Sequence, residues 1–142
     1  MADYEAALLR GVGETLDAET HLAWIDPDTL AAYLPDAVGV YLGVVPSEPK
    51  TAVAMNAYTV AMWPDPIVGV QFHIAAEDPD ELTRATQAVA DVLEGRWGGM
   101  LGTVKLVASA WQSGTPLGQD ANGRHQRTEN YYLTIARPIK QR

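Results

Sequence analysis

The sequence predicts an α+β domain of two layers, in which helices pack on one face of a mostly antiparallel or mixed sheet of four to five strands. Residues 38–45, 67–74 and 103–111 alternate side chains with period two, as strands do. Residues 79–94 instead repeat apolar side chains at helical spacing. The 142 residues contain no internal repeat and no long linker, so residues 1–142 are expected to form a single domain.

The first expected element is a helix from Asp3, its N-cap, to about Asp17. Its buried stripe comprises Leu8, Leu9, Val12 and Leu16. Gly11 and Gly13 weaken it by about 1 kcal/mol each relative to alanine. Residues 20–34 are ambiguous, because Pro27 within them and Pro35 after them bracket room for only a short helix, and the segment is expected to be a loop with one or two helical turns.

Strands come next. Residues 38–45 and 51–58 are expected to pair as a hairpin across the turn Pro-Ser-Glu-Pro-Lys at 46–50. Residues 67–74 form a third strand with an apolar face and a face that carries Gln71 and His73. The polar face is therefore expected to meet water.

The helix at 79–94 has a signal at each end. Asp78 is the expected N-cap, Pro79 takes the first helical position, Glu81 completes a capping box and Gly95 ends the helix. Its apolar stripe comprises Leu82, Ala85, Val89, Val92 and Leu93. This stripe is expected to cover the sheet.

The last third of the chain is read as two strands, at 103–111 and 127–137, on either side of a long loop at 112–126 that is rich in glycine and proline. Tyr131 and Tyr132 must point to opposite faces of their strand. One of them therefore meets something other than the helix layer, which favours a subunit contact.

Chemistry-bearing residues are sparse. The chain has no cysteine, and its three histidines lie far apart without a carboxylate at metal-ligand spacing. It contains neither a phosphate loop nor a nucleophile-elbow pattern. We therefore expect no catalytic, metal-binding or cofactor-binding residue, no cofactor and no enzymatic activity. No apolar run reaches the ~18–20 residues of a membrane span, so no membrane partner is expected.

Charge is divided unevenly along the chain. Residues 1–100 carry 16 acidic and 4 basic side chains, a sum of −12, whereas residues 101–142 carry 2 and 6, a sum of +4. The acidic total argues against a nucleic-acid-binding module. The basic segment suits a head-to-tail contact with the acidic body of an identical neighbour, although scattered solvated charge is the alternative.

Three tryptophans at strand ends or in Gly- and Pro-rich turns are typical of interface anchors, with core packing as the alternative. Together with the basic segment and the tyrosine pair, they define the candidate subunit or partner contacts: Trp63, Trp97, Trp111, Arg124, Arg127, Tyr132 and Arg137.

The run Gly-Gln-Asp-Ala-Asn-Gly-Arg-His-Gln-Arg-Thr-Glu-Asn-Tyr-Tyr-Leu-Thr-Ile-Ala-Arg at 118–137 follows a capped helix, a Gly-rich turn and a strand. In this order it resembles the C-terminal half of tail terminator proteins from long-tailed phages. The resemblance extends upstream through Val-Gly-Val-Gln-Phe-His-Ile at 68–74 and Gly-Val-Tyr-Leu-Gly-Val-Val-Pro at 39–46, and so covers about residues 38–137. Residues 57–66 do not match.

The resemblance implies a virion protein, made in the host cytoplasm, that forms a ring at the head-proximal end of the tail tube, usually a hexamer. Such a ring stops tube growth, contacts the tail tube protein and the head–tail connector protein, and lets DNA pass through its lumen without specific binding. Another connector component, such as a stopper or a minor capsid protein, is the nearest alternative. A small-ligand-binding α+β domain is the more distant one.

Overall fold

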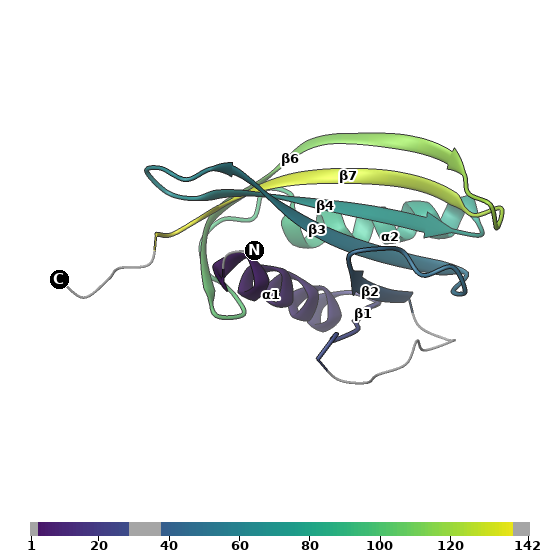
Figure 1. Ribbon diagram of the computed structural model, residues 1–142, viewed down its shortest axis with the longest axis horizontal. Helices are drawn as coiled ribbons and strands as arrows, with labels where there is room; N and C mark the ends of the chain where they lie inside the picture. Colours follow the sequence, from purple (N-terminus) through teal and green to yellow (C-terminus); the bar gives the residue numbers. More distant parts are fainter. Residues whose placement is uncertain (1–2, 29–37, 138–142) are drawn as a thin grey trace.

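A computed structural model describes residues 3–28 and 38–137, and in Figure 1 a twisted sheet lies over two helices. The elements are α1 (Asp3–Glu19), β1 (Leu22–Trp24), β2 (Val38–Leu42), β3 (Thr51–Ala61), β4 (Ile67–Ala76), α2 (Pro79–Leu93), β5 (Met100–Leu101), β6 (Val104–Gln119) and β7 (His125–Ile135). The strand order is β1-β2-β3-β4-β7-β6-β5. Both helices lie on the same side of this sheet, so the molecule has two layers.

The fold class is α+β, but the expected count of four to five strands was wrong, because the sheet has seven. The two shortest strands, β1 and β5, contain 3 and 2 residues. Runs this short cannot show a period-two pattern. β1 lies within the segment 20–34 that was expected to be a loop with helical turns, and residues 29–34 of that segment lie outside the described residues.

The hairpin expected from 38–45 and 51–58 was also wrong, because β2 pairs with β3 in parallel, from Gly39 opposite Ala52 to Leu42 opposite Met55. Instead of reversing direction in a tight turn at 46–50, the chain loops back so that β3 begins beside the start of β2 and runs in the same direction. The connecting segment is held by a residue far away in the chain, since the Arg124 guanidinium donates to the carbonyls of Pro46 and Pro49. Those long-range contacts have no local sequence signal.

The region expected to be a loop at 112–126 is mostly strand. β6 continues to Gln119, opposite His125 of β7, and only a tight turn separates the two strands. Proline and glycine are tolerated because, beyond residue 109, β6 lies at the edge of the described sheet. Pro116 therefore withholds no hydrogen bond from a neighbouring described strand on that side.

The helix α2 matches its prediction closely. Asp78 is the N-cap and accepts from the Asp80 N–H at 2.8 Å. The capping box is a correction, because the Glu81 carboxylate accepts a hydrogen bond from the Thr51 hydroxyl at 2.6 Å. That bond ties the start of α2 to the start of β3, which the local motif could not indicate.

The core lies between the helices and the sheet. Leu8, Val12 and Leu16 of α1 are fully buried, and so are Val89 and Leu93 of α2. They pack on the inner side chains of β3, β4 and β7. Phe72 and Tyr131 meet edge to face with ring centroids 5.9 Å apart. This arrangement agrees with the expectation that the helix at 79–94 covers the strands near 67–75, 103–111 and 127–137.

The opposite face of the sheet carries no helix, and we call it the open face (Figure 1). Cross-strand pairing aligns its side chains in rows, and one row is made of amides and a hydroxyl: Asn56, Gln71, Asn130 and Ser113. The rows on either side contain tyrosine, threonine, histidine and alanine. From residue 52 in β3 to residue 134 in β7 these paired rows contain no charged residue.

Candidate assembly surfaces

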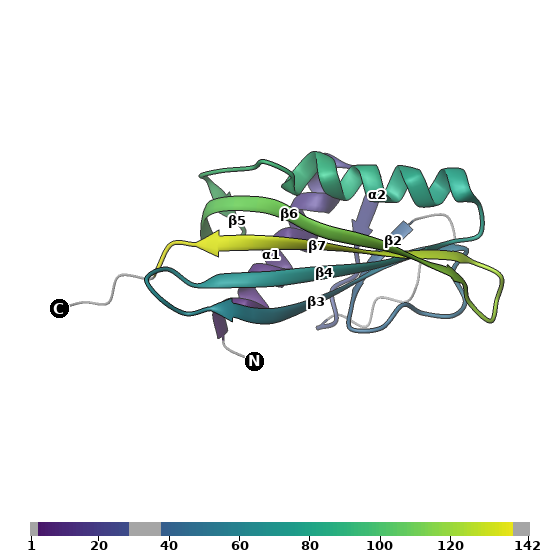
Figure 2. The ribbon, with the colours of Figure 1, turned by 90° about the horizontal axis from the view of Figure 1, so that it is seen from above.

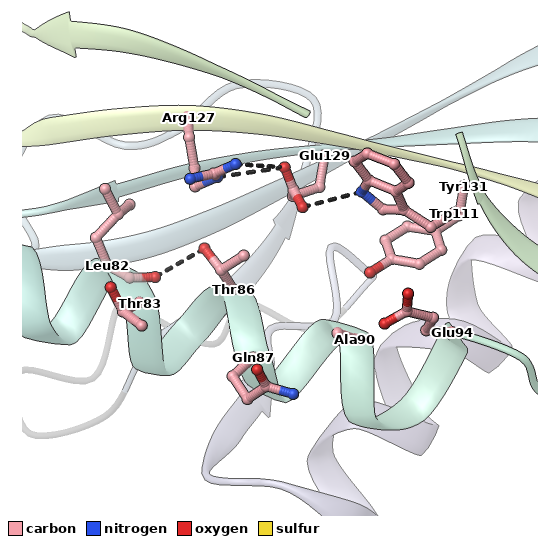
Figure 3. A pocket seen from close by; sticks show the side chains of 10 residues that line it. All are labelled: Leu82, Thr83, Thr86, Gln87, Ala90, Glu94, Trp111, Arg127, Glu129 and Tyr131. Atoms are coloured by element: carbon pink, nitrogen blue, oxygen red, sulfur yellow. Dashed lines mark hydrogen bonds and ion pairs between the residues drawn. The ribbon is translucent and has the colours of Figure 1, made fainter. Parts of the chain in front are cut away.

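A groove of about 350 Å³ lies between the outer side of α2 and the strands β6 and β7 (Figure 3). Its floor contains Tyr131 and Glu129, and Trp111 stands at its rim with 46% of its surface exposed. The Trp111 indole N–H donates to one Glu129 oxygen at 3.1 Å. The Arg127 guanidinium donates to the other oxygen at 3.1 and 3.2 Å. Two candidate residues are thus held by one buried carboxylate.

Three side chains of this groove are bonded to one another, Trp111, Arg127 and Glu129. Gly114 faces Glu129 so closely that a Cβ at this position would overlap the carboxylate. Burial raises the pKa of Tyr131 far above its ordinary value, and the negative charges of Glu129 and Glu94 add to this effect. Tyr131 therefore stays protonated at any physiological pH. Because the Trp111 indole N–H is bonded to Glu129, the surface that Trp111 exposes to a partner is apolar.

A second surface is the hairpin between β3 and β4, which projects from one end of the sheet in Figures 1 and 2. Trp63 lies in this turn and is 77% exposed. Arg137 places its guanidinium 4.8 Å from the centre of the Trp63 ring and donates to the carbonyls of Pro64, at 2.7 Å, and Met62. The hairpin is therefore fastened to the end of β7.

Arg124 is buried, with only 6% of its surface exposed. It forms an ion pair with Asp120 at 2.8 Å within the β6–β7 turn, in addition to its bonds to the 46–50 segment. Burial alone would raise the pKa of Asp120, but hydrogen bonds from the backbone and side chain of Arg124 and from the Asn122 backbone outweigh it and lower that pKa. The bonds of Arg124 thus join parts of the same subunit and stabilise its fold.

Trp97 and Tyr132 lie apart from these clusters. Trp97 is 82% exposed in the turn between α2 and β5, where it bridges to Ala108 of β6. Tyr132 is on the open face, opposite Gly69. Tyr58, on the neighbouring strand β3, covers Gly69 on the same face and donates to the Asn130 side chain at 3.2 Å. One tyrosine of the 131–132 pair is therefore in the core and the other is outside it, as the alternation predicts.

The sequence patterns did not single out Glu129, which accepts hydrogen bonds from Trp111 and Arg127, or Tyr58, which covers Gly69 and donates to Asn130. Glu129 is the only acidic residue between 121 and 142, and this isolation was a usable signal. Strand alternation alone places Glu129 on the same face as Arg127, two positions earlier, whereas its contact with Trp111 could be found only with the β6–β7 register known. Tyr58 falls in the 57–66 segment that matched no family pattern.

The described residues offer no obvious metal site. Among residues 3–28 and 38–137, no three His, Asp or Glu side chains gather as metal ligands would. The ring of His73 instead contacts the Gln126 amide oxygen at 2.7 Å. No helix in the same ranges is both long and apolar enough to span a membrane.

Of the comparisons with known proteins, the one with solved structures gives a match. No family model matches the chain, and no curated protein matches it. Among solved structures, it is similar to a chain of the "Virion of native gene transfer agent (GTA) particle", with a TM-score of 0.50 and 15% sequence identity. The alignment covers 92% of this chain and 92% of that chain. At this identity the likeness shows a similar fold over the aligned part of the chain and nothing further.

Proposed function

We propose that this chain is a structural virion protein, specifically a tail terminator. In this role it forms a ring, a hexamer, at the head-proximal end of a tail tube, stops tube growth and joins the tail to the head connector. The observation that carries the proposal is the likeness to a virion chain over 92% of both chains. The order of motifs between residues 38 and 137, which resembles that of tail terminators, supports the finer role.

The surfaces support work by assembly rather than by catalysis. Exposed tryptophans stand on two separate places, the β3–β4 hairpin and the α2–β5 turn, and a third is half exposed at the β6 edge. Large aromatic side chains in such positions serve as anchors for partners. In the groove beside α2, the Trp111 and Arg127 side chains both donate to the Glu129 carboxylate, so these three groups are engaged in the fold.

One part of the expected ring contact changes. Of the four basic residues between 101 and 137, three have partners inside the subunit: Arg124, Arg127 and Arg137. A contact in which these arginines meet the acidic body of a neighbour therefore loses its main support. Uncharged surfaces of the described residues therefore become candidates for the contact between subunits.

A deletion tests the role. In particles made without this chain, tail tubes should be abnormally long or of mixed length and should not be attached to heads, and a plasmid copy should restore both properties. Electron microscopy of negatively stained particles measures both. Tails of normal length that are joined to heads would rule out a terminator.

The nearest alternative remains another head–tail connector component, since the similar structure is that of a whole virion. Tails of normal length that stay separate from heads would favour that alternative. Gold labelling of an epitope on this protein, which should mark a single position at the head–tail junction, separates both connector roles from a ligand-binding domain outside the particle.

A further inference from the structure

The sheet has a free edge on each side of its four long strands. On one side, the Met55 carbonyl of β3 accepts from the Gly43 N–H at 3.0 Å, and this is where pairing with β2 ends. Backbone groups along a strand point alternately to either side. Those of Ala57 and Thr59 therefore point outward as those of Met55 do, and in the described ranges no strand pairs with β3 there.

The other free edge belongs to β6. Ser109 donates its N–H to the Arg96 carbonyl at 2.7 Å, and beyond this bond no described segment pairs with β6 on its outer side. The same alternation points the backbone of Trp111 outward and, after the bulge that follows, that of Gly114. Pro116 has no N–H and ends the usable edge.

These two edges are not protected in the way that solitary edges usually are. Monomeric proteins commonly place lysine or another charged residue on an edge strand to prevent pairing. Neither residues 56–61 of β3 nor residues 110–115 of β6 include a charged side chain. The bulge and Pro116 shorten the β6 edge without closing it, so each strand offers about six residues.

The surfaces beside the two edges are complementary. A groove of about 530 Å³ lies between α1 and the free edge of β3, and its lining includes Leu9, Leu42 and Ala57. Beside the β6 edge, Trp111 protrudes on the same, helix-bearing face of the sheet. If the sheet were continued from β3 by the β6 of another copy, Trp111 of that copy would project toward this groove.

Strand direction is consistent with such a contact. Three successive antiparallel pairings separate β3 from β6, so the two strands run in opposite directions within one subunit. Rotation about an axis parallel to the strands keeps their direction. The β6 of one copy therefore meets the β3 of the next in the antiparallel sense.

We infer that the free edge of β6 in one copy of the chain pairs antiparallel with the free edge of β3 in the next copy, and that Trp111 of the first copy enters the groove beside α1 of the second. The contact is heterologous and repeats around a ring. Trp111 still exposes 46% of its surface within the subunit, and burial of a large aromatic side chain is a common source of interface affinity, which makes Trp111 the main anchor. The inference rests on the proposed function in that it assigns the contact by which the ring is built.

Cross-linking tests which edges meet, because the chain has no cysteine of its own. Thr59→Cys marks the β3 edge, Gln112→Cys marks the β6 edge, and Thr83→Cys on exposed α2 is the control. A short bismaleimide should join T59C to Q112C when the two proteins are mixed. It should give far less product with either protein alone, or with T59C and T83C.

A proline tests whether backbone pairing holds the contact. The Thr59 N–H points outward, so Thr59→Pro removes a donor that no described strand uses. We expect T59P to weaken self-association about tenfold or more, as measured by sedimentation, whereas T59A, which keeps the N–H, should assemble like the parent. Circular dichroism and thermal unfolding check that T59P keeps its fold. If it does not, Trp111→Ser takes its place, with the same expected loss of assembly.

The outcomes separate this inference from the proposed function. A ring that forms normally with T59P or W111S and gives no T59C–Q112C product overturns the edge contact and leaves the terminator role intact. A protein that stays monomeric and unlinked at the highest soluble concentration also overturns it. The terminator role is judged independently by tail length in the deletion.

Discussion

Arg137, at the end of β7, holds its guanidinium 4.8 Å from the centre of the Trp63 ring in the β3–β4 hairpin. Both were candidate contact residues on the sequence, one for its charge and one for its aromatic ring. Here they contact each other. The pair turns an exposed hairpin into a fixed projection, with the exposed face of Trp63 still available to a partner.

We expect Arg137→Ala to loosen this hairpin without unfolding the protein. The variant loses an exposed cation–π contact worth about 0.5–1 kcal/mol and the hydrogen bonds to the Pro64 and Met62 carbonyls. Amide exchange at 61–66 should quicken about tenfold, while the global free energy of unfolding falls by about 1 kcal/mol or less. Arg137→Lys keeps the charge but not the planar group, so its exchange rates at the hairpin should lie between those of the parent and R137A. Unchanged exchange in R137A would show that Arg137 does not fasten the hairpin.

Arg124→Met should be far more damaging. It removes the buried guanidinium that pairs with Asp120 and donates to two carbonyls of the 46–50 segment, and each buried group left without its hydrogen bond costs about 1–3 kcal/mol. Urea unfolding of the purified protein measures the change. Arg84→Met on the exposed side of α2 is the matched control and should change stability by less than about 0.5 kcal/mol. Equal effects of the two substitutions would contradict the assignment of Arg124 to the fold.

Stability should depend on pH through Asp120. Its pKa is lowered in the folded protein, so its contribution is fully present above its unfolded pKa of about 4 and is lost as the pH falls through the lower folded value. The free energy of unfolding of the parent should therefore exceed that of Asp120→Asn at pH 6. The difference should shrink below about pH 4. A difference that stayed constant from pH 6 to pH 3 would mean that the charge of Asp120 does not matter.

Gly11→Ala tests how closely α1 approaches the β5 backbone. On propensity alone, alanine would stabilise the helix by about 1 kcal/mol. A Cβ at Gly11 would however overlap the Leu101 carbonyl, which is backbone and cannot move aside cheaply. We expect a net loss of about 1–3 kcal/mol in thermal or urea unfolding. Glu14→Ala, on the exposed side of the same helix, is the control, and a more stable G11A would refute the close approach.

Gly11 also shows where sequence reasoning stopped. The pattern predicted both helices, since an apolar stripe and local end signals act over a few residues. It counted Gly11 only as a weakness of α1, because the reason for a glycine lies in Leu101, ninety positions away in the chain and close only in the fold. The same limit applies to the parallel pairing of β2 with β3, whose connecting segment is bonded to the distant Arg124.

The candidate residues divide in the same way. Exposure of Trp63 and Trp97 followed from their turns, and the position of Tyr132 followed from alternation. The arginines could not be placed, because a charge pattern records how many basic residues a segment has and not which of them find partners. The bond between Trp111 and Glu129 depends on the bulges in β6, which place Tyr131 opposite Trp111 and Gly114 opposite Glu129 and leave no local trace in the sequence.

The place of β7 in the sheet determines when this protein can fold during synthesis. Among the described strands, β7 leaves the ribosome last, yet it lies between β4 and β6. Until it emerges, β4 lacks one neighbour and the long β6 has no inner partner, so a nascent chain exposes two aggregation-prone edges together. Completion of the sheet therefore waits until β7 has left the ribosome. A ribosome stalled between β6 and β7 would hold a chain that needs chaperone protection.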